Sequence, residues 1–261
     1  MCLIWKGLNG MKINQVMDVA IKAGKILLTN GSEIYRVEDT IGRICRCYGV
    51  EAECFVLPTG IFITVIGKDG EPLSYVKRIN ERTVDLSCIE KVNSFSRNLQ
   101  KNTMSYEEAV KTLGNIEREK GYRFGLRLLV AGITALVYTL LFRGTVQDSI
   151  AAFFIGMLIY ISKEKVSRAG IFRFFEYFAS GLIAASVSII AVKLFPFLNV
   201  YRIIISSIMI LLPGVATTNA LKDALHGDIV SSQFGIAEAI FIVVSVSAGV
   251  AIILSLGLGW I

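Results

Sequence analysis

The polar residues best suited to chemistry in this sequence gather in one apolar stretch of its C-terminal half. Pro213 and Gly214 are expected to break a helix there, because proline removes a backbone donor and clashes with the preceding turn. If a helix resumes after them, Asn219, Asp223 and His226 fall at positions i, i+4 and i+7 and share one face. Two neighbouring threonine hydroxyls and the first N–H groups of the restarted helix are expected close by.

Broken helices that present hydroxyl groups and backbone ends hold small substrates in many membrane transporters. The pattern therefore indicates a transport pathway, whose candidate residues are Pro213, Gly214, Thr217, Thr218, Asn219, Asp223, His226 and Asp228. The alternative is a cytoplasmic loop between two membrane spans, in which Asp223 and Asp228 are simply hydrated.

Polar residues also lie on the last apolar helix expected in the sequence, at 233–260. Gly235, Glu238, Ser245 and Gly249 line one side of it. A carboxylate such as Glu238, about one turn inside an apolar helix, must face protein or water, and in a transporter it can carry a coupling proton. The alternative is an interface residue whose carboxylate reaches water. Glu238 and Ser245 complete the candidate pathway.

A third polar feature is a stripe of small residues on another apolar stretch. Ser180, Ala184 and Ser188 repeat every four positions, a spacing that favours close helix packing in membranes over a pathway. The stripe needs a surface to pack against, which suggests a membrane partner.

The elements that position these residues follow from composition. The chain has 261 residues, is 54% hydrophobic and has a mean hydropathy of +0.61. Residues 1–123 carry 18 of the 27 basic and 15 of the 21 acidic residues, so residues 124–261 are far more apolar. The fold class predicted is a soluble α+β N-terminal domain, residues 1–123, followed by an α-helical transmembrane bundle, residues 124–261.

A membrane-spanning helix needs about 20 apolar residues. Five stretches come close, the second and fourth being short enough that four spans is the alternative. They run over 124–142, 146–162, 174–195, 201–214 and 233–260.

Basic residues flank these spans unevenly, and Lys and Arg mark the cytoplasmic side. The two basic clusters are Arg118, Lys120, Arg123 and Arg127, then Lys163, Lys165, Arg168 and Arg173. They predict a cytoplasmic N-terminus and an external Ile261. Nothing near Met1 resembles a cleaved signal peptide, so the first span is expected to act as its own insertion signal. We see no basic face with aromatic partners, which argues against nucleic-acid binding.

The soluble region shows alternating helix and strand patterns. Helical spacing of apolar residues covers 13–27 and 34–48, with Gly31 as a stop and Ser32 as the cap of the second helix. Extended runs follow at 52–57, 61–66 and 73–79, joined by turns at Pro58–Gly60 and Lys68–Gly70, and predict a hairpin. Two further helices are expected near 85–100 and 105–120, the second with a capping box between Ser105 and Glu108.

Enzyme chemistry has little to build on. The five cysteines are Cys2, Cys45, Cys47, Cys54 and Cys88, and they form no CxxC pair. With His226 as the only histidine, neither a zinc site nor a Cys–His nucleophile is expected. A glycine-rich phosphate loop is also missing from the sequence. We therefore predict a protein that is not an enzyme, holds no cofactor and keeps its cysteines reduced in the cytoplasm.

From about Lys12 onward the sequence resembles the threonine/serine exporter family, in its larger domain or subunit. The segments that carry this are residues 30–38 (Asn-Gly-Ser-Glu-Ile-Tyr-Arg-Val-Glu), residues 57–60 (Leu-Pro-Thr-Gly), and residues 213–228 followed by Glu238. The resemblance implies a bacterial inner-membrane exporter, driven by an ion or proton gradient, for threonine and serine or for small dicarboxylic acids.

Long members of that family fuse two membrane halves with about ten spans, whereas split members use a large and a small protein. This chain has one half, so the resemblance implies the large subunit of a hetero-oligomer with a small membrane-protein partner. Two rival interpretations are a membrane-anchored sensor or scaffold, whose soluble domain binds a cytosolic partner, and a membrane-embedded enzyme. The first needs only one span, and the second needs a nucleophile or metal cluster.

Overall fold

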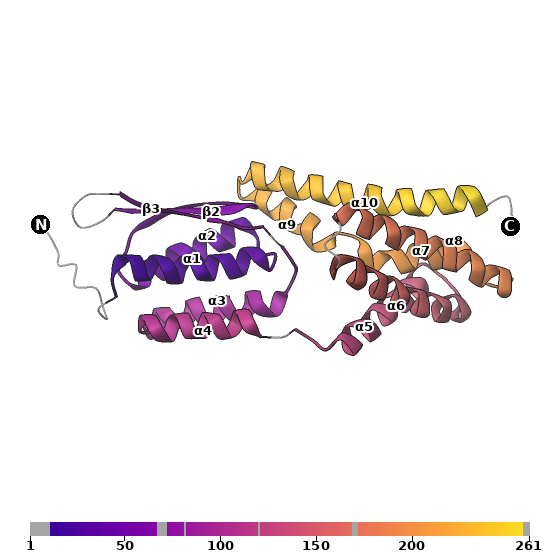
Figure 1. Ribbon diagram of the computed structural model, residues 1–261, viewed down its shortest axis with the longest axis horizontal. Coiled ribbons are helices and arrows are strands. Elements are labelled where there is room, and N and C mark those ends of the chain that lie inside the picture. The colour runs from indigo at the N-terminus through magenta and orange to yellow at the C-terminus, as the bar shows by residue number, and fades with distance from the viewer. Residues whose placement is uncertain (1–10, 67–71, 81, 120, 169–171, 258–261) are drawn as a thin grey trace, which may run out of the picture. The chain divides into compact units, whose positions relative to one another are not determined.

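The computed structural model describes residues 11–66, 72–80, 82–119, 121–168 and 172–257. They form two compact units (Figure 1). The N-terminal unit comprises the chain up to Gly121 together with Val215–Ile236, and the helical unit comprises Tyr122–Gly214 together with the chain from Ala237 onward. The segment Val215–Ile236, expected within the membrane region, thus groups with the N-terminal elements.

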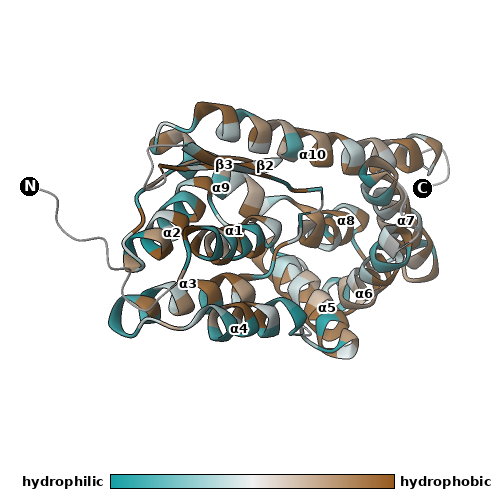
Figure 2. Ribbon diagram, turned by 60° about the vertical axis from the view of Figure 1, so that its left-hand side comes forward, coloured by the Kyte–Doolittle hydropathy of each residue, from teal (hydrophilic) through white to brown (hydrophobic). Residues whose placement is uncertain are grey.

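Four helices of the N-terminal unit come from the first half of the chain. They are α1 (Ile13–Thr29), α2 (Ile34–Cys47), α3 (Leu86–Lys101) and α4 (Tyr106–Arg118). Apolar residues at spacings of three and four give each helix a buried face, and these faces meet in one core. The helices accordingly show brown and teal sides in Figure 2. All four match the predicted helices, and the capping box between Ser105 and Glu108 is present.

Helix α1 ends as predicted, because Gly31 adopts a φ of +83°, which glycine reaches without strain. The prediction that Ser32 caps the next helix was wrong. Helix α2 begins at Ile34 after Glu33, and the Ser32 hydroxyl is buried without a hydrogen-bond partner among the described residues. A side chain from a distant part of the sequence takes over the cap, as described below.

A three-stranded antiparallel sheet covers the helices α1 and α2 in Figure 1. Its strands are β1 (Ala52–Leu57), β2 (Gly60–Ile66) and β3 (Pro72–Arg78), in that order. Ile61, Ile63 and Val65 alternate along β2 and are buried, whereas Phe62 between them is exposed. The predicted strands and the turn at Pro58–Gly60 are confirmed. The second predicted turn, Lys68–Gly70, lies outside the described residues.

The helical unit consists of apolar helices. They are α5 (Phe124–Leu141), α6 (Val146–Arg168), α7 (Arg173–Leu194), α8 (Val200–Ile208), the short 3-10 helix η1 (Met209–Leu211) and the second part of α10 (Ile229–Gly257). Among the described residues, four helices are long and apolar enough to cross a membrane, or five if the interrupted pair Val200–Leu211 and Gly214–Leu225 counts as one span. Figure 2 shows α10 brown along most of its length.

The predicted spans match these helices to within one residue except at three ends. The fourth predicted span, 201–214, ends at Leu211, and residue 260, the predicted end of the last span, lies outside the described residues. Helix α6 continues six residues beyond the predicted end at Ser162, into the charged segment that finishes at Arg168. Helix α10 starts at Ile229 rather than at residue 233. Its part within the helical unit, Ala237–Gly257, has 21 residues. At about 1.5 Å per residue, this part is about 31 Å long and matches the roughly 30 Å hydrocarbon core of a bilayer.

Helices α7 and α10 approach each other at two glycines. A Cβ at Gly181 would lie 2.4 Å from the carbonyl oxygen of Val246, and one at Gly249 would lie 2.3 Å from that of Phe178. Backbone contact this close is typical of helix packing in membranes, where small residues replace the hydrophobic drive of water.

The small-residue stripe belongs to the interior of the helical unit. Ser180, Ala184 and Ser188 are all fully buried, and both serine hydroxyls donate to carbonyl oxygens of their own helix. The prediction that the stripe serves packing is therefore confirmed. The chain itself covers the stripe, so the argument that the stripe calls for a partner was wrong.

Asp148 joins two connections of the helical unit. Its carboxylate accepts hydrogen bonds from the backbone N–H of Thr145, at 2.9 Å, and of Asn199, at 2.8 Å. Asp148 is fully buried, and it caps α6 while it fixes the segment before α8. The sequence analysis did not select this residue.

Candidate functional site

The predicted helix break is present. Helix η1 ends at Leu211, Leu212 and Pro213 are not helical, and α9 (Gly214–Leu225) begins immediately afterwards. The Gly214 N–H donates to the carbonyl oxygen of Leu212 at 2.9 Å. Proline explains the interruption, because its ring removes a donor and clashes with the preceding turn.

The polar face of α9 is held by the loop between α1 and α2, within the N-terminal unit. Asp223 is 5% exposed, and its Oδ1 accepts a hydrogen bond from the Ile34 N–H at 3.1 Å. The Asn219 amide donates to the carbonyl oxygen of Gly31 at 2.8 Å. Asp223 therefore supplies the cap that Ser32 does not, and its negative charge suits the positive end of the α2 dipole.

Two further pairs extend this contact. The Lys222 ammonium lies 2.9 Å from Glu33 Oε1 and donates a hydrogen bond to it. The His226 ring stacks on the Tyr35 ring, with centroids 3.8 Å apart and an angle of 4° between the planes. The predicted common face of Asn219, Asp223 and His226 is thus occupied by residues 31–35, although α9 itself ends at Leu225.

Acidic groups lie close together at the contact between α9 and residues 31–35, which we call the joint. Burial alone would raise the pKa of Glu33, but the hydrogen bond from Lys222 and the nearby Arg36 hold that pKa below its usual value. Burial raises the pKa of Glu38, with the negative charges of Asp228 and Asp223 adding to the effect, although the Val56 N–H donates to the Glu38 carboxylate. The joint therefore contains more acidic than basic groups, and the cations Lys222 and Arg36 lie beside Glu33.

The two segments that meet at this joint are among those that carry the resemblance to the threonine/serine exporter family. Residues 30–38 and residues 213–228 are far apart in the sequence, and the Asp223–Ile34 hydrogen bond spans 189 positions. Sequence analysis singled out each segment but gave no reason to place them together.

The remaining candidate residues are placed separately. Thr217 and Thr218 are exposed, and Asp228 is half-buried beside Asp223, whose carbonyl oxygen accepts from the Asp228 N–H at 2.9 Å. Glu238 belongs to the helical unit, where its carboxylate lies 2.7 Å from the Arg173 guanidinium. The Ser245 hydroxyl is buried and donates to a carbonyl oxygen of its own helix.

The helical unit carries three ion pairs between neighbouring helices, which we call the charged layer. Its ion pairs are Arg127–Glu164 at 3.6 Å, Lys163–Glu176 at 4.0 Å and Arg173–Glu238 at 2.7 Å. The pairs link α5 to α6, α6 to α7, and α7 to α10. Glu238 of α10 is therefore paired with a cation of the neighbouring helix α7.

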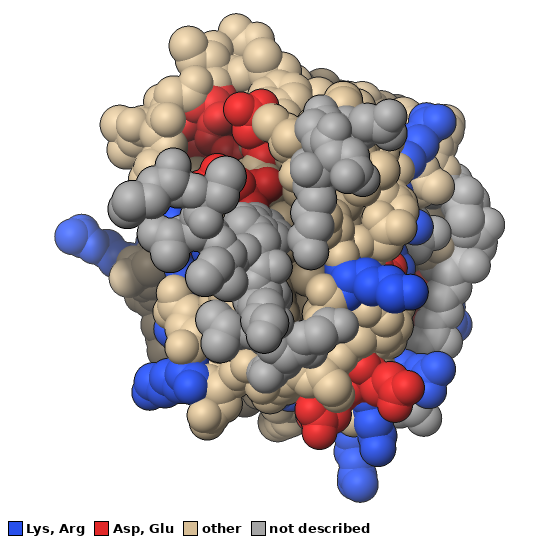
Figure 3. Space-filling model, turned by 90° about the vertical axis from the view of Figure 1, so that its left-hand side faces the viewer, with Lys and Arg blue, Asp and Glu red and all other residues tan. Residues whose placement is uncertain are grey.

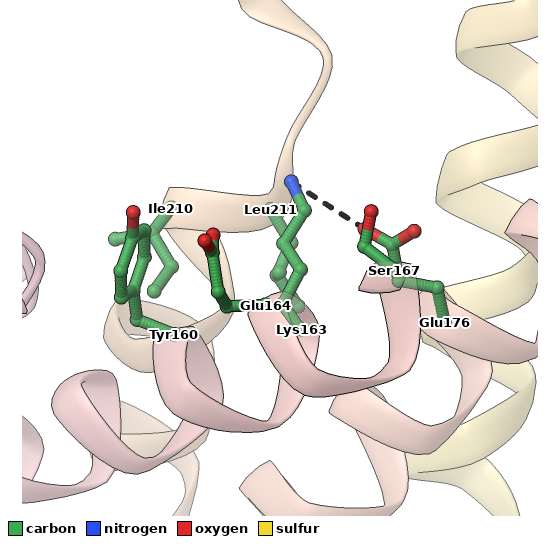
Figure 4. A pocket seen from close by; sticks show the side chains of 7 residues that line it. All are labelled: Tyr160, Lys163, Glu164, Ser167, Glu176, Ile210 and Leu211. Carbon is green, nitrogen blue, oxygen red and sulfur yellow. Dashed lines mark ion pairs between the residues drawn. The ribbon is translucent and has the colours of Figure 1, made fainter. Parts of the chain in front are cut away.

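A pocket lies within the charged layer, lined in part by Lys163 and Glu176 (Figure 4). Sequence analysis read Lys163 only as an orientation signal. The available clue was that Lys163, Glu164 and Glu176 flank the same short connection, which brings both charge types to one end of two neighbouring helices.

The four described cysteines are free, with Cys45 buried and the other three partly buried. Burial raises the pKa of the Cys45 and Cys54 thiols to about 12, so neither is a thiolate at neutral pH. Cys47 and Cys88 are also free, and Cys2 lies outside the described residues. Among the described residues, no group of three or more His, Cys, Asp or Glu side chains could hold a metal ion. Figure 3 shows basic side chains scattered around its visible face, with acidic groups among them.

Comparison with known proteins decides the family. A family model described as "Putative threonine/serine exporter" matches residues 18–257, which is most of the chain. The chain belongs to the threonine/serine exporter family. It is therefore a multi-pass membrane protein of a transporter family, and not an enzyme. No solved structure matches the chain.

Three relatives show how this exporter-family chain aligns. "Probable succinate transporter subunit YjjP" of Escherichia coli (strain K12) is 22% identical over 250 residues, which cover 94% of this chain and 97% of that protein. "Threonine/serine exporter" of Corynebacterium glutamicum is 25% identical, covering 91% of this chain and 50% of that protein. "Probable threonine/serine exporter" of Mycobacterium tuberculosis is 21% identical, covering 94% and 47%. The chain thus spans about half the length of the two exporters.

Proposed function

We propose that this protein is the large subunit of a two-protein exporter in the bacterial inner membrane. Its substrates are small amino acids such as threonine and serine, or small dicarboxylic acids, and an ion or proton gradient drives it. The observation that carries this proposal is the match to nearly the full length of a relative that is itself named a transporter subunit. The chain aligns with about half of two relatives named exporters, and with nearly all of one named a subunit. In the proposed hetero-oligomer, a smaller membrane protein supplies the other membrane half.

The proposed topology places the N-terminal unit in the cytoplasm. Two basic clusters lie around the start of α5 and around the end of α6, and cytoplasmic flanks carry the excess of Lys and Arg. The charged layer gathers residues from both clusters, which supports a cytoplasmic interface at this level. A periplasmic reporter fused after Ile261 is expected to be active, and the same reporter fused after Glu119 inactive. The reverse pattern contradicts this topology.

The proposed pathway includes the break at Pro213 and Gly214 and the polar residues that follow it. Thr217 and Thr218 are exposed on α9, where their hydroxyls can contact a passing solute. Asn219, Asp223 and His226 hold α9 to residues 31–35, and the charge of Asp223 takes part in the pathway itself. Asp228, Glu238 and Ser245 complete the pathway, Glu238 at its cytoplasmic entrance and Ser245 on the same side of α10.

The proposal is tested by excretion from a host that lacks its own threonine exporters. Cells loaded with threonine-, serine- or succinate-yielding precursors are compared with and without this chain and a candidate small partner. Co-expression is expected to increase excretion of at least one of these solutes, and dissipating the ion gradients should abolish the increase. Unchanged excretion of all three solutes by the co-expressing cells contradicts the exporter function.

A sensor or scaffold anchored in the membrane remains the weaker candidate. An anchor needs one span, whereas this chain has four or five apolar helices among its described residues. Absence of export, together with a stable complex between the N-terminal unit and a cytosolic protein, would favour that role.

A further inference from the structure

A cavity of about 240 Å³ opens in the helical unit where the end of α6, the start of α7 and η1 meet. Its lining residues are Tyr160, Lys163, Glu164, Ser167, Glu176, Ile210 and Leu211 (Figure 4). Pockets for drug-sized ligands run from about 300 to 1,000 Å³, so this cavity suits a molecule of only a few non-hydrogen atoms.

The Lys163 ammonium and the Glu176 carboxylate face each other at this cavity but do not form a hydrogen bond. The Lys163 ammonium lies 4.0 Å from Glu176 Oε1, which is too long for a hydrogen bond. The same ammonium stands 5.0 Å over the Tyr177 ring, and that contact holds it near the cavity. Figure 4 shows the Lys163 ammonium directed toward Glu176 and Ser167. The gap leaves both groups able to bond a guest.

We propose that this cavity binds a small zwitterion of the α-amino acid type, with Lys163 holding its carboxylate and Glu176 its ammonium group. An α-amino acid carries both charges on one carbon, so its two groups match a cation and an anion about 4 Å apart. The Ser167 hydroxyl, which also lines the cavity, is placed to donate to the carboxylate of the bound amino acid. This inference rests on the proposed exporter function, and it selects one of the two substrate classes given there.

The charge of the lining disfavours a dicarboxylic acid. The cavity holds one cation and two carboxylates, and Glu164 is offset in part by Arg127 at 3.6 Å. A zwitterion adds no net charge to this set. A dicarboxylate adds two negative charges, one of which must approach the Glu176 carboxylate, and such like-charge contacts are costly.

The position of the cavity places its guest at the helix break. Leu211 lines the cavity and is the last residue of η1, two positions before Pro213. A bound amino acid therefore contacts η1, the helix that ends just before the break at Pro213 and Gly214. The cavity is a substrate site beside the break, formed by residues that differ from the polar face of α9.

The test uses everted membrane vesicles that contain the full chain and its small partner, with labelled L-threonine, L-serine and succinate as probes. Lys163→Gln is expected to raise the KM for L-threonine about tenfold or more, because a hydrogen bond to a charged group is lost. Glu176→Gln should act in the same direction. The matched control is Lys165→Gln, an exposed lysine on the same helix outside the cavity, which should stay within about twofold of wild type.

Direct binding separates failure of this site from failure of the exporter function. Calorimetry on the purified complex should show L-threonine binding to wild type, weaker binding to Lys163→Gln, and weak binding of L-threonine methyl ester to both. Equal threonine affinity in Lys163→Gln and Lys165→Gln overturns the site, as does no threonine binding by wild type or tighter binding of succinate. Threonine binding without vesicle transport leaves the site standing and counts against the exporter function.

Discussion

The two units of this protein pack their interiors with different residues. The N-terminal unit buries large aliphatic side chains such as Leu27, Ile41 and Ile61. The helical unit brings its helices together through small ones, with Gly181 and Gly249 against backbone carbonyl groups. Water drives the burial of large apolar side chains, whereas lipid is as apolar as leucine and leaves close backbone contact as the source of affinity. The same chain therefore tolerates change differently in its two parts.

The largest expected effect comes from adding a side chain at Gly249. Its Cβ would lie 2.3 Å from the Phe178 carbonyl oxygen, and a backbone atom cannot move aside. Gly249→Val is expected to destabilise the helical unit by about 3 kcal/mol or more. The measurement is thermal unfolding of the full chain in detergent. The fraction of protein that remains soluble after heating to each temperature is determined by size-exclusion chromatography.

The N-terminal unit offers the contrasting variant. A Cβ at Gly24 would meet the end of the Ile41 side chain at 2.6 Å, and a flexible side chain can shift. Gly24→Ala is expected to change stability by no more than about 1 kcal/mol, because alanine also favours the helix. Gly125→Ala has open space around it and serves as the control in the helical unit. Equal losses in Gly24→Ala and Gly249→Val would break the comparison.

The next effect concerns a buried carboxylate in the helical unit. Asp148→Ala leaves the N–H groups of Thr145 and Asn199 without their acceptor and is expected to cost about 2–3 kcal/mol. Asp148→Asn keeps one acceptor oxygen and should lose less. Thermal unfolding of both variants checks the order, and an Asp148→Ala protein as stable as wild type would show that these connections do not depend on the carboxylate.

The joint between α9 and α2 gives a smaller effect on stability and a larger one on transport. Asp223→Ala removes the cap of α2 and should cost about 1–2 kcal/mol. Asp223→Asn retains an oxygen acceptor and removes a buried charge, so its stability should equal or exceed that of wild type. Export should nevertheless fall sharply in both. Wild-type export by Asp223→Asn would mean that its charge has no part in the pathway.

The smallest expected effect is a pH dependence at Glu38. Burial, together with nearby Asp228 and Asp223, raises the pKa of this carboxyl in the folded chain. Glu38 therefore supports folding fully below its unfolded-state pKa, and this support is lost as the pH rises through the folded-state value. Glu38→Gln should unfold with a flatter pH dependence above about pH 4.5, whereas the exposed control Glu53→Gln should follow wild type. Parallel curves for wild type and Glu38→Gln contradict the assignment.

Local patterns in the sequence predicted most of the elements. Apolar spacing located the strands and the membrane-length helices, because side-chain period and length depend on neighbouring residues alone. Pro213 located the break for the same reason. The first strand matches the predicted residues 52–57.

Contacts between distant segments escaped prediction. Ser32 was the best local candidate for the α2 cap, yet the acceptor comes from Asp223, 189 positions after Ile34. Lys163 served only as an orientation signal, and only the packing of α6 against α7 and η1 brings it together with Glu176 in the lining of a cavity. The spacing of Thr145 and Asp148 was a local capping signal that the sequence analysis passed over, whereas the bond from Asn199 to Asp148 joins positions 51 apart.

The central claim is that this chain is half of an exporter, and reconstitution tests it most directly. Proteoliposomes loaded with labelled L-threonine contain this chain alone, a small partner alone, or both, and efflux is followed after an ion gradient is imposed. The account predicts gradient-dependent efflux only when both proteins are present. Full activity with this chain alone would contradict the two-protein account.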